Sequence, residues 1–252
     1  MRQFDVFVFE EENPNFNQWK PIFEDDALGW QHSSDWNAPL QGIDAEWVIF
    51  THPSVTIDRD FLNNLAEVIE GFPMVDAFAP RVKFDGHFYG GHLLNGAKGF
   101  APISENEKMR FVAAPHPLIG VFSSRIIQRT GLFDLSLPAE FRLLDYTLRM
   151  AHAGGKMFSV PYLVAQVKNT QEDADTNLVN GKFLQAASSI RPEWKIIYKN
   201  LNVSSLLGFS LRHLGTTPLW FNTKELKFKR DKATSLSKLT ADYLQPPARW
   251  CF

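Results

Sequence analysis

Cysteine is nearly absent from this chain of 252 residues, in which Cys251 is the only one. A single thiol excludes a disulfide framework and a metal cluster built on cysteines, so we expect a protein of a reducing compartment. The sequence also lacks an apolar run of about 20 residues that could cross a bilayer. The N-terminus, Met1–Asp5, has no long apolar stretch of the signal-peptide type. These absences together predict a cytoplasmic protein.

An excess of either charge is missing too, because the net charge is −2. Without a basic surplus, the composition does not indicate binding to nucleic acid. Apolar material is plentiful: 44% of the residues are hydrophobic and 13% are aromatic. That is enough to bury the core of one large domain.

The charges are unevenly distributed along the chain. Residues 195–252 hold ten lysines and arginines against three acidic residues. Within them, residues 224–232 (KELKFKRDK) follow Trp220 and Phe221. Two interpretations stay open: a solvated face, or a patch that contacts an anionic membrane surface or an anionic acceptor. We predict a main domain over residues 1–194 and a basic C-terminal extension over 195–252 that packs on it.

Short apolar runs alternate with helical patterns through the first two thirds of the chain. Runs of β-branched and aromatic residues predict strands, and apolar residues at every third or fourth position predict helices. The expected strands are 5–10, 47–50, 75–80, 81–84, 118–122, 157–160 and 163–167, and the expected helices are 15–25, 61–69, 124–129 and 142–153. This alternation predicts an α/β fold with a mostly parallel sheet flanked by helices. We expect the Gly-rich residues 85–110 to form a long loop or irregular hairpins.

Three segments, in this order, resemble one enzyme family. Residues 42–62 (GIDAEWVIFTHPSVTIDRDFL) look like its strand, Asn-Pro-Asp-Val turn and helix, and residues 79–86 (APRVKFDG) look like the strand and Asp-Gly turn that follow. Residues 120–161 contain GVFSSRIIQRTGLFD and DYTLRMAHAGGKMFSVP, similar to its strand, helix, Gly-Phe-Asp turn, acidic helix and last strand. The family is the inverting family 2 glycosyltransferases of the GT-A fold, especially the rhamnosyltransferase-like branch.

The resemblance implies an activity and a set of ligands. Its members bind a nucleoside-diphosphate sugar and move the sugar to an acceptor with inversion. For this chain it implies transfer of a hexose or deoxyhexose to a glycan or lipid-linked acceptor, in surface polysaccharide biosynthesis. In the family an acidic turn holds Mg²⁺ or Mn²⁺ on the diphosphate, and a second carboxylate acts as base on the acceptor hydroxyl.

The metal-binding motif is altered in this sequence. The family's aspartate falls on Ser54, in a His-Pro-Ser-Val turn. A hydroxyl is a poor ligand for a hard divalent cation, so we predict that the reaction needs no metal, although the resemblance implies Mg²⁺ or Mn²⁺. Three interpretations of His52 in the same turn stay open: it binds a softer metal, it donates a hydrogen bond to a phosphate, or it has no ligand. The resemblance implies further donor contacts from Glu10, Asp35 and Asp85.

The usual catalytic base is also absent. Counting back from Arg149, the family's Glu-Asp pair falls on Arg142 and Leu143. Glu140 and Asp145 are the candidates to replace it, and Asp145 is equally well explained as a structural helix residue. The guanidinium of Arg142 suits phosphate oxygens, which predicts a contact with the diphosphate. With two motifs altered, another interpretation stays open: a catalytically inactive GT-A-like domain that binds a glycan or supports a partner transferase.

Two weaker signals complete the sequence. Trp36 could stack on a base or sugar, although core packing is the commoner place for tryptophan. His87 and His92 lie five residues apart without a third ligand at a clear spacing, so they predict surface residues and no zinc site.

Overall fold

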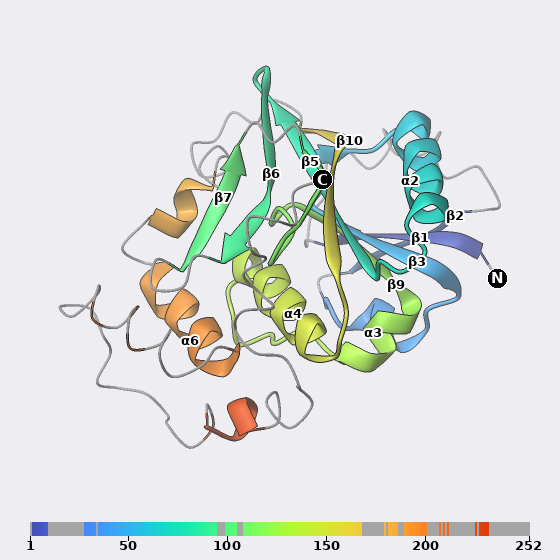
Figure 1. Cartoon of the computed structure of the whole chain (residues 1–252). Helices are drawn as coiled ribbons and strands as arrows, with labels where there is room; N and C mark the ends of the chain where they lie inside the picture. The colour runs from blue at the N-terminus through green and yellow to red at the C-terminus, as the bar shows by residue number, and fades with distance from the viewer. Residues whose placement is uncertain are drawn as a thin grey trace.

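The fold comes from a computed structural model (Figure 1). It describes residues 2–9, 28–33, 35–94, 99–104, 108–167, 179, 181–185, 189–200, 207, 209, 211, 225 and 227–231. The helix predicted over 15–25 and the side chain of Glu10 lie outside these residues. So does most of the basic C-terminal extension, whose contact with an anionic surface stays a prediction.

The described residues form one mixed sheet of ten strands, with the main order β2-β1-β3-β9-β5-β10-β4. The bounds of these strands are β1 Arg2–Phe9, β2 Leu28–Ser33, β3 Ala45–Thr51, β4 Val55–Thr56, β5 Ala77–Phe84, β9 Ile119–Ser123 and β10 Met157–Val167. β1 is parallel to β2 and β3, and β5 is parallel to β10. β9 runs antiparallel to both β3 and β5 and therefore lies between two groups of parallel strands.

Helices cover both faces of the sheet because successive side chains of a strand point to opposite faces. In β1, Val6 and Val8 join the core under α2 (Arg59–Gly71). Phe7 and Phe9 join the core under α3 (Ser124–Thr130) and α4 (Ala139–His152). Figure 1 shows α2 apart from α3 and α4, on either side of the strands. The predicted α/β architecture is confirmed.

Local signals set the helix starts. The Asp58 side chain accepts a hydrogen bond from the Phe61 amide at 2.8 Å and so caps α2, as an N-cap aspartate is expected to. Ser123 caps α3 in the same way, accepting from the Ile126 amide. α4 begins directly after Pro138, three residues before the predicted start, so Glu140 lies in its first turn.

The Gly-rich segment forms hairpins, the second of the two predicted forms. β6 (His87–Leu94) pairs with β5 and with β7 (Phe100–Ser104), while β8 (Arg110–Phe111) pairs with β10. Asp85 and Gly86 make the two-residue turn between β5 and β6, with φ of 47° and 75°. Aspartate and glycine are the residues that most readily take this left-handed conformation. Asp85 therefore lies at the exposed tip of a hairpin.

Helix α6 (Ile190–Asn200) packs on the outer side of α4, with Trp194 and Ile197 against Leu144 and Leu148. α6 crosses residue 194, where we place the end of the main domain, and the division into two parts stays a prediction. Two 3-10 helices, η2 (Ala38–Gln41) and η4 (Lys182–Gln185), complete the described elements. None of the helices among the described residues combines the length and apolar character needed to span a membrane.

Candidate functional site

The carboxyl ends of β1, β2 and β3 meet at one edge of the sheet. In open α/β sheets, ligands bind outside the carboxyl ends of the strands. The start of α4 also lies here, since Arg142 stacks on a ring that follows β2. We call this group of residues the carboxyl edge: Asp35, Trp36, His52, Ser54, Glu140 and Arg142.

Trp36 is the packing centre of the carboxyl edge. Its ring is only 3% exposed and lies 4.0 Å from the ring of Phe9 and 5.3 Å from that of Phe133, measured between centroids. The guanidinium of Arg142 stands 5.1 Å above the Trp36 ring, and Arg142 Nε donates to the Leu137 carbonyl at 3.0 Å. The cation–π contact and the hydrogen bond together orient the Arg142 fork.

The turn after β2 is fixed to the loop before α4. Asp35 accepts a hydrogen bond from the Asn37 amide at 2.9 Å and leaves an exposed carboxylate. The Asn37 side chain and the Phe133 backbone exchange two hydrogen bonds, of 2.8 and 3.3 Å. The positions of Asp35 and Trp36 therefore depend on a segment almost 100 residues further along the chain.

The turn after β3 holds its histidine in one orientation. His52 is buried, and its Nδ1 accepts from the Ser54 amide at 3.1 Å and contacts the Ser54 hydroxyl at 2.7 Å. Because the amide can only donate, Nδ1 is the acceptor and Nε2 carries the ring proton. The ring proton of His52 is therefore on Nε2, and the Ser54 hydroxyl is engaged with the histidine.

Glu140 and Arg142 form the side of the carboxyl edge that α4 supplies. Both side chains are half-buried. Burial lowers the pKa of Arg142, and the nearby carboxylates of Glu140 and Asp134 oppose that shift. Glu140 is therefore close enough to Arg142 to interact with it electrostatically, and it lies beside the groups that could contact a donor.

Asp145 is placed differently from the other predicted site residues. It is fully buried, with Oδ2 accepting from Arg149 Nε at 2.8 Å and Oδ1 lying 2.6 Å from Lys199 Nζ. Burial opposes its ionisation, but the two cations hold its pKa below the usual range. Asn200 adds a hydrogen bond at 3.3 Å. These contacts fit the interpretation of Asp145 as a structural helix residue.

The structure thus brings Asp35, His52, Ser54, Glu140 and Arg142 to one edge of the sheet. Asp145 lies beneath α6 instead. The partners of Asp145, Lys199 and Asn200, were not singled out from the sequence. Their signal was the amphipathic helix at residues 190–200, whose apolar residues pack on α4.

Two buried histidines, His92 and His116, were not recognised as buried from the sequence. The prediction that His92 lies at the surface is wrong: it is 1% exposed, with Nδ1 donating to the Pro115 carbonyl at 3.0 Å. His116, which the sequence analysis passed over, is buried and donates from Nε2 to the Val179 carbonyl at 2.7 Å. Burial lowers the pKa of His92 to about 4 and that of His116 to about 3. Both are therefore neutral near pH 7.

The fold family raises the question of Mg²⁺ or Mn²⁺. Within the part of the chain that the structure describes, no three histidine, cysteine or acidic side chains are grouped to hold a metal ion. The turn after β3 offers a hydroxyl and an imidazole that already bond to each other. Hard divalent cations favour carboxylate oxygen, so this donor set does not fit them. Metal independence stays a prediction for experiment.

No protein-family model matches the sequence, and no curated protein sequence matches it. Solved structures share the fold. GalNAc-T7 with UDP, GalNAc and Mn²⁺ superposes with a TM-score of 0.65 at 9% identity, over 98% of this chain and 57% of that one. The mannosyltransferase PcManGT from Pyrobaculum calidifontis, with GDP-Man and Mn²⁺, gives 0.52 at 13% identity, over 94% and 74%. S. aureus TarS with UDP-GlcNAc superposes with a TM-score of 0.51 at 13% identity, over 92% of this chain and 79% of that one.

The chain therefore has the GT-A fold of nucleotide-sugar glycosyltransferases, as the resemblance predicted. It spans 57% of the length of the GalNAc-T7 chain. At 9–13% identity the likeness establishes the fold alone. Membership of the rhamnosyltransferase-like branch stays a prediction.

Proposed function

We propose that the chain is a glycosyltransferase that moves a hexose or deoxyhexose from a nucleotide-sugar donor to a glycan or lipid-linked acceptor. The observation that carries this proposal is the placement of Arg142 on Trp36 at the carboxyl edge of a GT-A sheet, with Trp36 and His52 both against Phe9. The ligands of the similar structures, UDP, GDP-Man and UDP-GlcNAc, support a donor of this class. Surface polysaccharide biosynthesis is the setting that the sequence resemblance suggests.

Two groups of the carboxyl edge bind the diphosphate of the donor. The planar fork of Arg142 matches two phosphate oxygens, and its stacking on Trp36 orients the fork before the donor arrives. We assign the second contact to His52 Nε2–H, because Nδ1 accepts from the Ser54 amide and leaves the ring proton on Nε2. The exposed carboxylate of Asp35 can accept hydrogen bonds from donor hydroxyls. Glu10, Ser54 and Asp85 belong to the proposed donor site by resemblance.

The reaction is a single displacement with inversion. The acceptor hydroxyl oxygen attacks the anomeric carbon, the bond from that carbon to the diphosphate oxygen breaks, and the hydroxyl proton passes to a carboxylate. We assign the base to Glu140, because Asp145 is enclosed and already holds two cations. Arg142 and His52 stabilise the negative charge that develops on the departing diphosphate.

Calorimetric titration with UDP, GDP, dTDP and their sugars, each with and without Mn²⁺, tests the donor site. We expect one nucleotide to bind at micromolar strength without metal. Arg142→Gln removes the charge and the fork and should weaken that binding by roughly tenfold or more, since charge-assisted hydrogen bonds contribute about 1.5–3 kcal/mol each. Arg125→Gln is the matched control, because Arg125 lies on α3 outside the carboxyl edge, where it is exposed and pairs with Asp76.

Failure of every nucleotide to bind would contradict the proposed donor site. Binding that strictly requires Mn²⁺ would contradict the prediction that the reaction needs no metal. The first result would favour the second candidate function, a catalytically inactive domain that binds a glycan or supports a partner transferase. Ser54 in place of the metal-binding aspartate and the enclosed position of Asp145 are the observations that favour it.

A further inference from the structure

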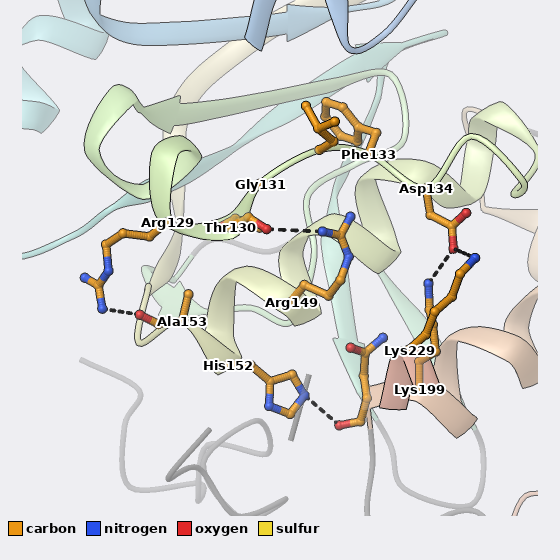
Figure 2. A pocket seen from close by; sticks show the side chains of 12 residues that line it. Arg129, Thr130, Gly131, Phe133, Asp134, Arg149, His152, Ala153, Lys199 and Lys229 are labelled. Carbon is orange, nitrogen blue, oxygen red and sulfur yellow. Dashed lines mark hydrogen bonds and ion pairs between the residues drawn. The ribbon is translucent and has the colours of Figure 1, made fainter. Parts of the chain in front are cut away.

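A pocket of about 490 Å³ lies among the C-terminal ends of α3, α4 and α6 (Figure 2). Its volume falls within the range of roughly 300–1,000 Å³ that is typical of small-molecule sites. The residues that line it do not include those of the carboxyl edge. Phe133 and Asp134 connect the two places, since both line the pocket, Phe133 contacts Trp36, and the Asp134 carboxylate acts on Arg142. The pocket is therefore a separate place on the molecule from the proposed donor site.

The pocket is positively charged. Its lining includes four cationic side chains and one carboxylate, that of Asp134. The cationic side chains are Arg129, Arg149, Lys199 and Lys229. Adding the buried Asp145 beneath them still leaves four positive charges against two negative ones. Glu225, which pairs with Lys229 at 3.0 Å, is more than half exposed, so solvent screens its contribution.

Three residues that line the pocket each hold a buried side-chain atom without a hydrogen-bond partner within the described residues: Arg149 Nη2, His152 Nδ1 and Asn200 Oδ1. His152 is 7% exposed, and its Nε2 bonds to the Asn200 carbonyl at 2.9 Å, as Figure 2 shows. Because that carbonyl can only accept, Nε2 carries the proton of the neutral ring and Nδ1 is an acceptor. The lining residues thus hold one cationic donor and two neutral acceptors that lack partners, and each costs about 1–3 kcal/mol while it stays unpaired.

The three unpaired atoms indicate which chemical groups a ligand of this pocket needs. An inorganic anion would pair with Arg149 but leave the two acceptors unsatisfied. A neutral sugar would meet the three atoms but leave the excess positive charge of the pocket uncompensated. Leu132 and Phe133 also line the pocket and offer apolar surface to a sugar ring. A ligand that meets all three needs combines hydroxyl groups, an apolar ring face and one acidic group.

We propose that this pocket binds a small anionic carbohydrate, a sugar that carries one phosphate or carboxylate group. The acidic group lies against the Arg149 guanidinium. Hydroxyl groups of the sugar donate to His152 Nδ1 and Asn200 Oδ1. The proposal concerns binding only and does not depend on the activity proposed for the carboxyl edge.

Calorimetry with glucose 1-phosphate, glucuronate, inorganic phosphate and glucose tests the ligand class. At least one of the two anionic sugars should bind at least tenfold more tightly than phosphate or glucose. If glucose 1-phosphate alone binds, the acidic group is a phosphate; if glucuronate alone binds, it is a carboxylate. Binding of phosphate as tight as that of the sugars, or no binding by either sugar, overturns the proposal.

Variants locate the binding. Arg149→Lys keeps a cation beside Asp145 but removes the Nη2 donor, and His152→Phe removes the acceptor; each should weaken binding of the anionic sugar roughly tenfold. Arg125→Gln, on α3 but outside the pocket, should leave it unchanged. Thermal unfolding of each variant checks that it is folded. Loss of binding in Arg142→Gln with retention in Arg149→Lys would place the sugar at the carboxyl edge and overturn the proposal.

Discussion

Helix α4 carries charged side chains in its first turn and in its middle, and the two places hold them differently. At the start, Glu140 and Arg142 are half-buried, and Arg142 rests on the face of Trp36. One turn further on, Asp145 is fully buried and holds Arg149 and Lys199 within 2.8 Å. The first group can reach a ligand, whereas the second joins α4 to α6. Position relative to the sheet edge, rather than residue type, separates a candidate catalytic carboxylate from a structural one.

The largest effect is expected from substitution of Glu140, the carboxylate in the first turn of α4. Glu140→Gln keeps the shape but cannot take the acceptor proton, so we expect kcat to fall roughly 10²- to 10⁴-fold, the usual contribution of a general base. The free energy of unfolding should change little, because Glu140 is half-buried at a helix start. Turnover of the donor found by titration, together with a urea unfolding curve, gives both quantities. Unchanged turnover would remove Glu140 from the mechanism.

The matching exchange in the middle of α4 should act on stability. Asp145→Asn leaves Lys199 and the Arg149 guanidinium without their buried carboxylate, which should cost about 3–5 kcal/mol of unfolding free energy. Urea denaturation measures this loss. Glu225→Gln is the control, since that partly exposed pair with Lys229 should contribute less than about 1 kcal/mol. A stable Asp145→Asn protein that has lost only turnover would show that Asp145, and not Glu140, is the base.

Acid should lower the stability of the fold through the buried histidines His92 and His116. The pKa values of His92 and His116 in the folded protein, about 4 and about 3, lie below the usual 6.5. Between the usual pKa and these lowered values, the unfolded chain binds more protons than the folded one. The free energy of unfolding therefore falls as pH falls from about 6.5 towards 4. Each histidine contributes a slope of up to about 1.4 kcal/mol per pH unit. Unfolding curves of wild type and His92→Gln compare the slopes, and equal slopes would contradict this account.

The regular part of the fold could be predicted from the sequence because its signals are local. Alternating apolar runs located β1, β3 and β9, and the Asp58 cap marked the start of α2. β2 was missed, since LGWQHS shows no clear alternation of apolar and polar residues. β10 was predicted as two strands because Pro161 interrupts it; the structure accommodates the proline at an irregularity between Ser159 and Val164.

The candidate site could be predicted only in part, for a related reason. His52 and Ser54 were identified because they follow a predicted strand and align with the turn of the resembled family, whereas Asp35 was identified by the resemblance alone. The enclosure of Asp145 could not be foreseen, since its partner Lys199 comes from a helix more than 50 residues away. His92 looked like a surface residue in a Gly-rich segment, yet the pairing of its strand with Ala114 buries it.

The position of β9 has a consequence for how the protein is made. β3 and β5 leave the ribosome before β9, but in the sheet β9 lies between them. Until Ser123 has been synthesised, the facing edges of β3 and β5 have no partner, and unpaired strand edges are where newly made chains associate wrongly. Folding of the sheet centre therefore cannot proceed strand by strand with translation. It must wait until β9 has emerged, so the segment from β3 to β9 depends on protection during synthesis.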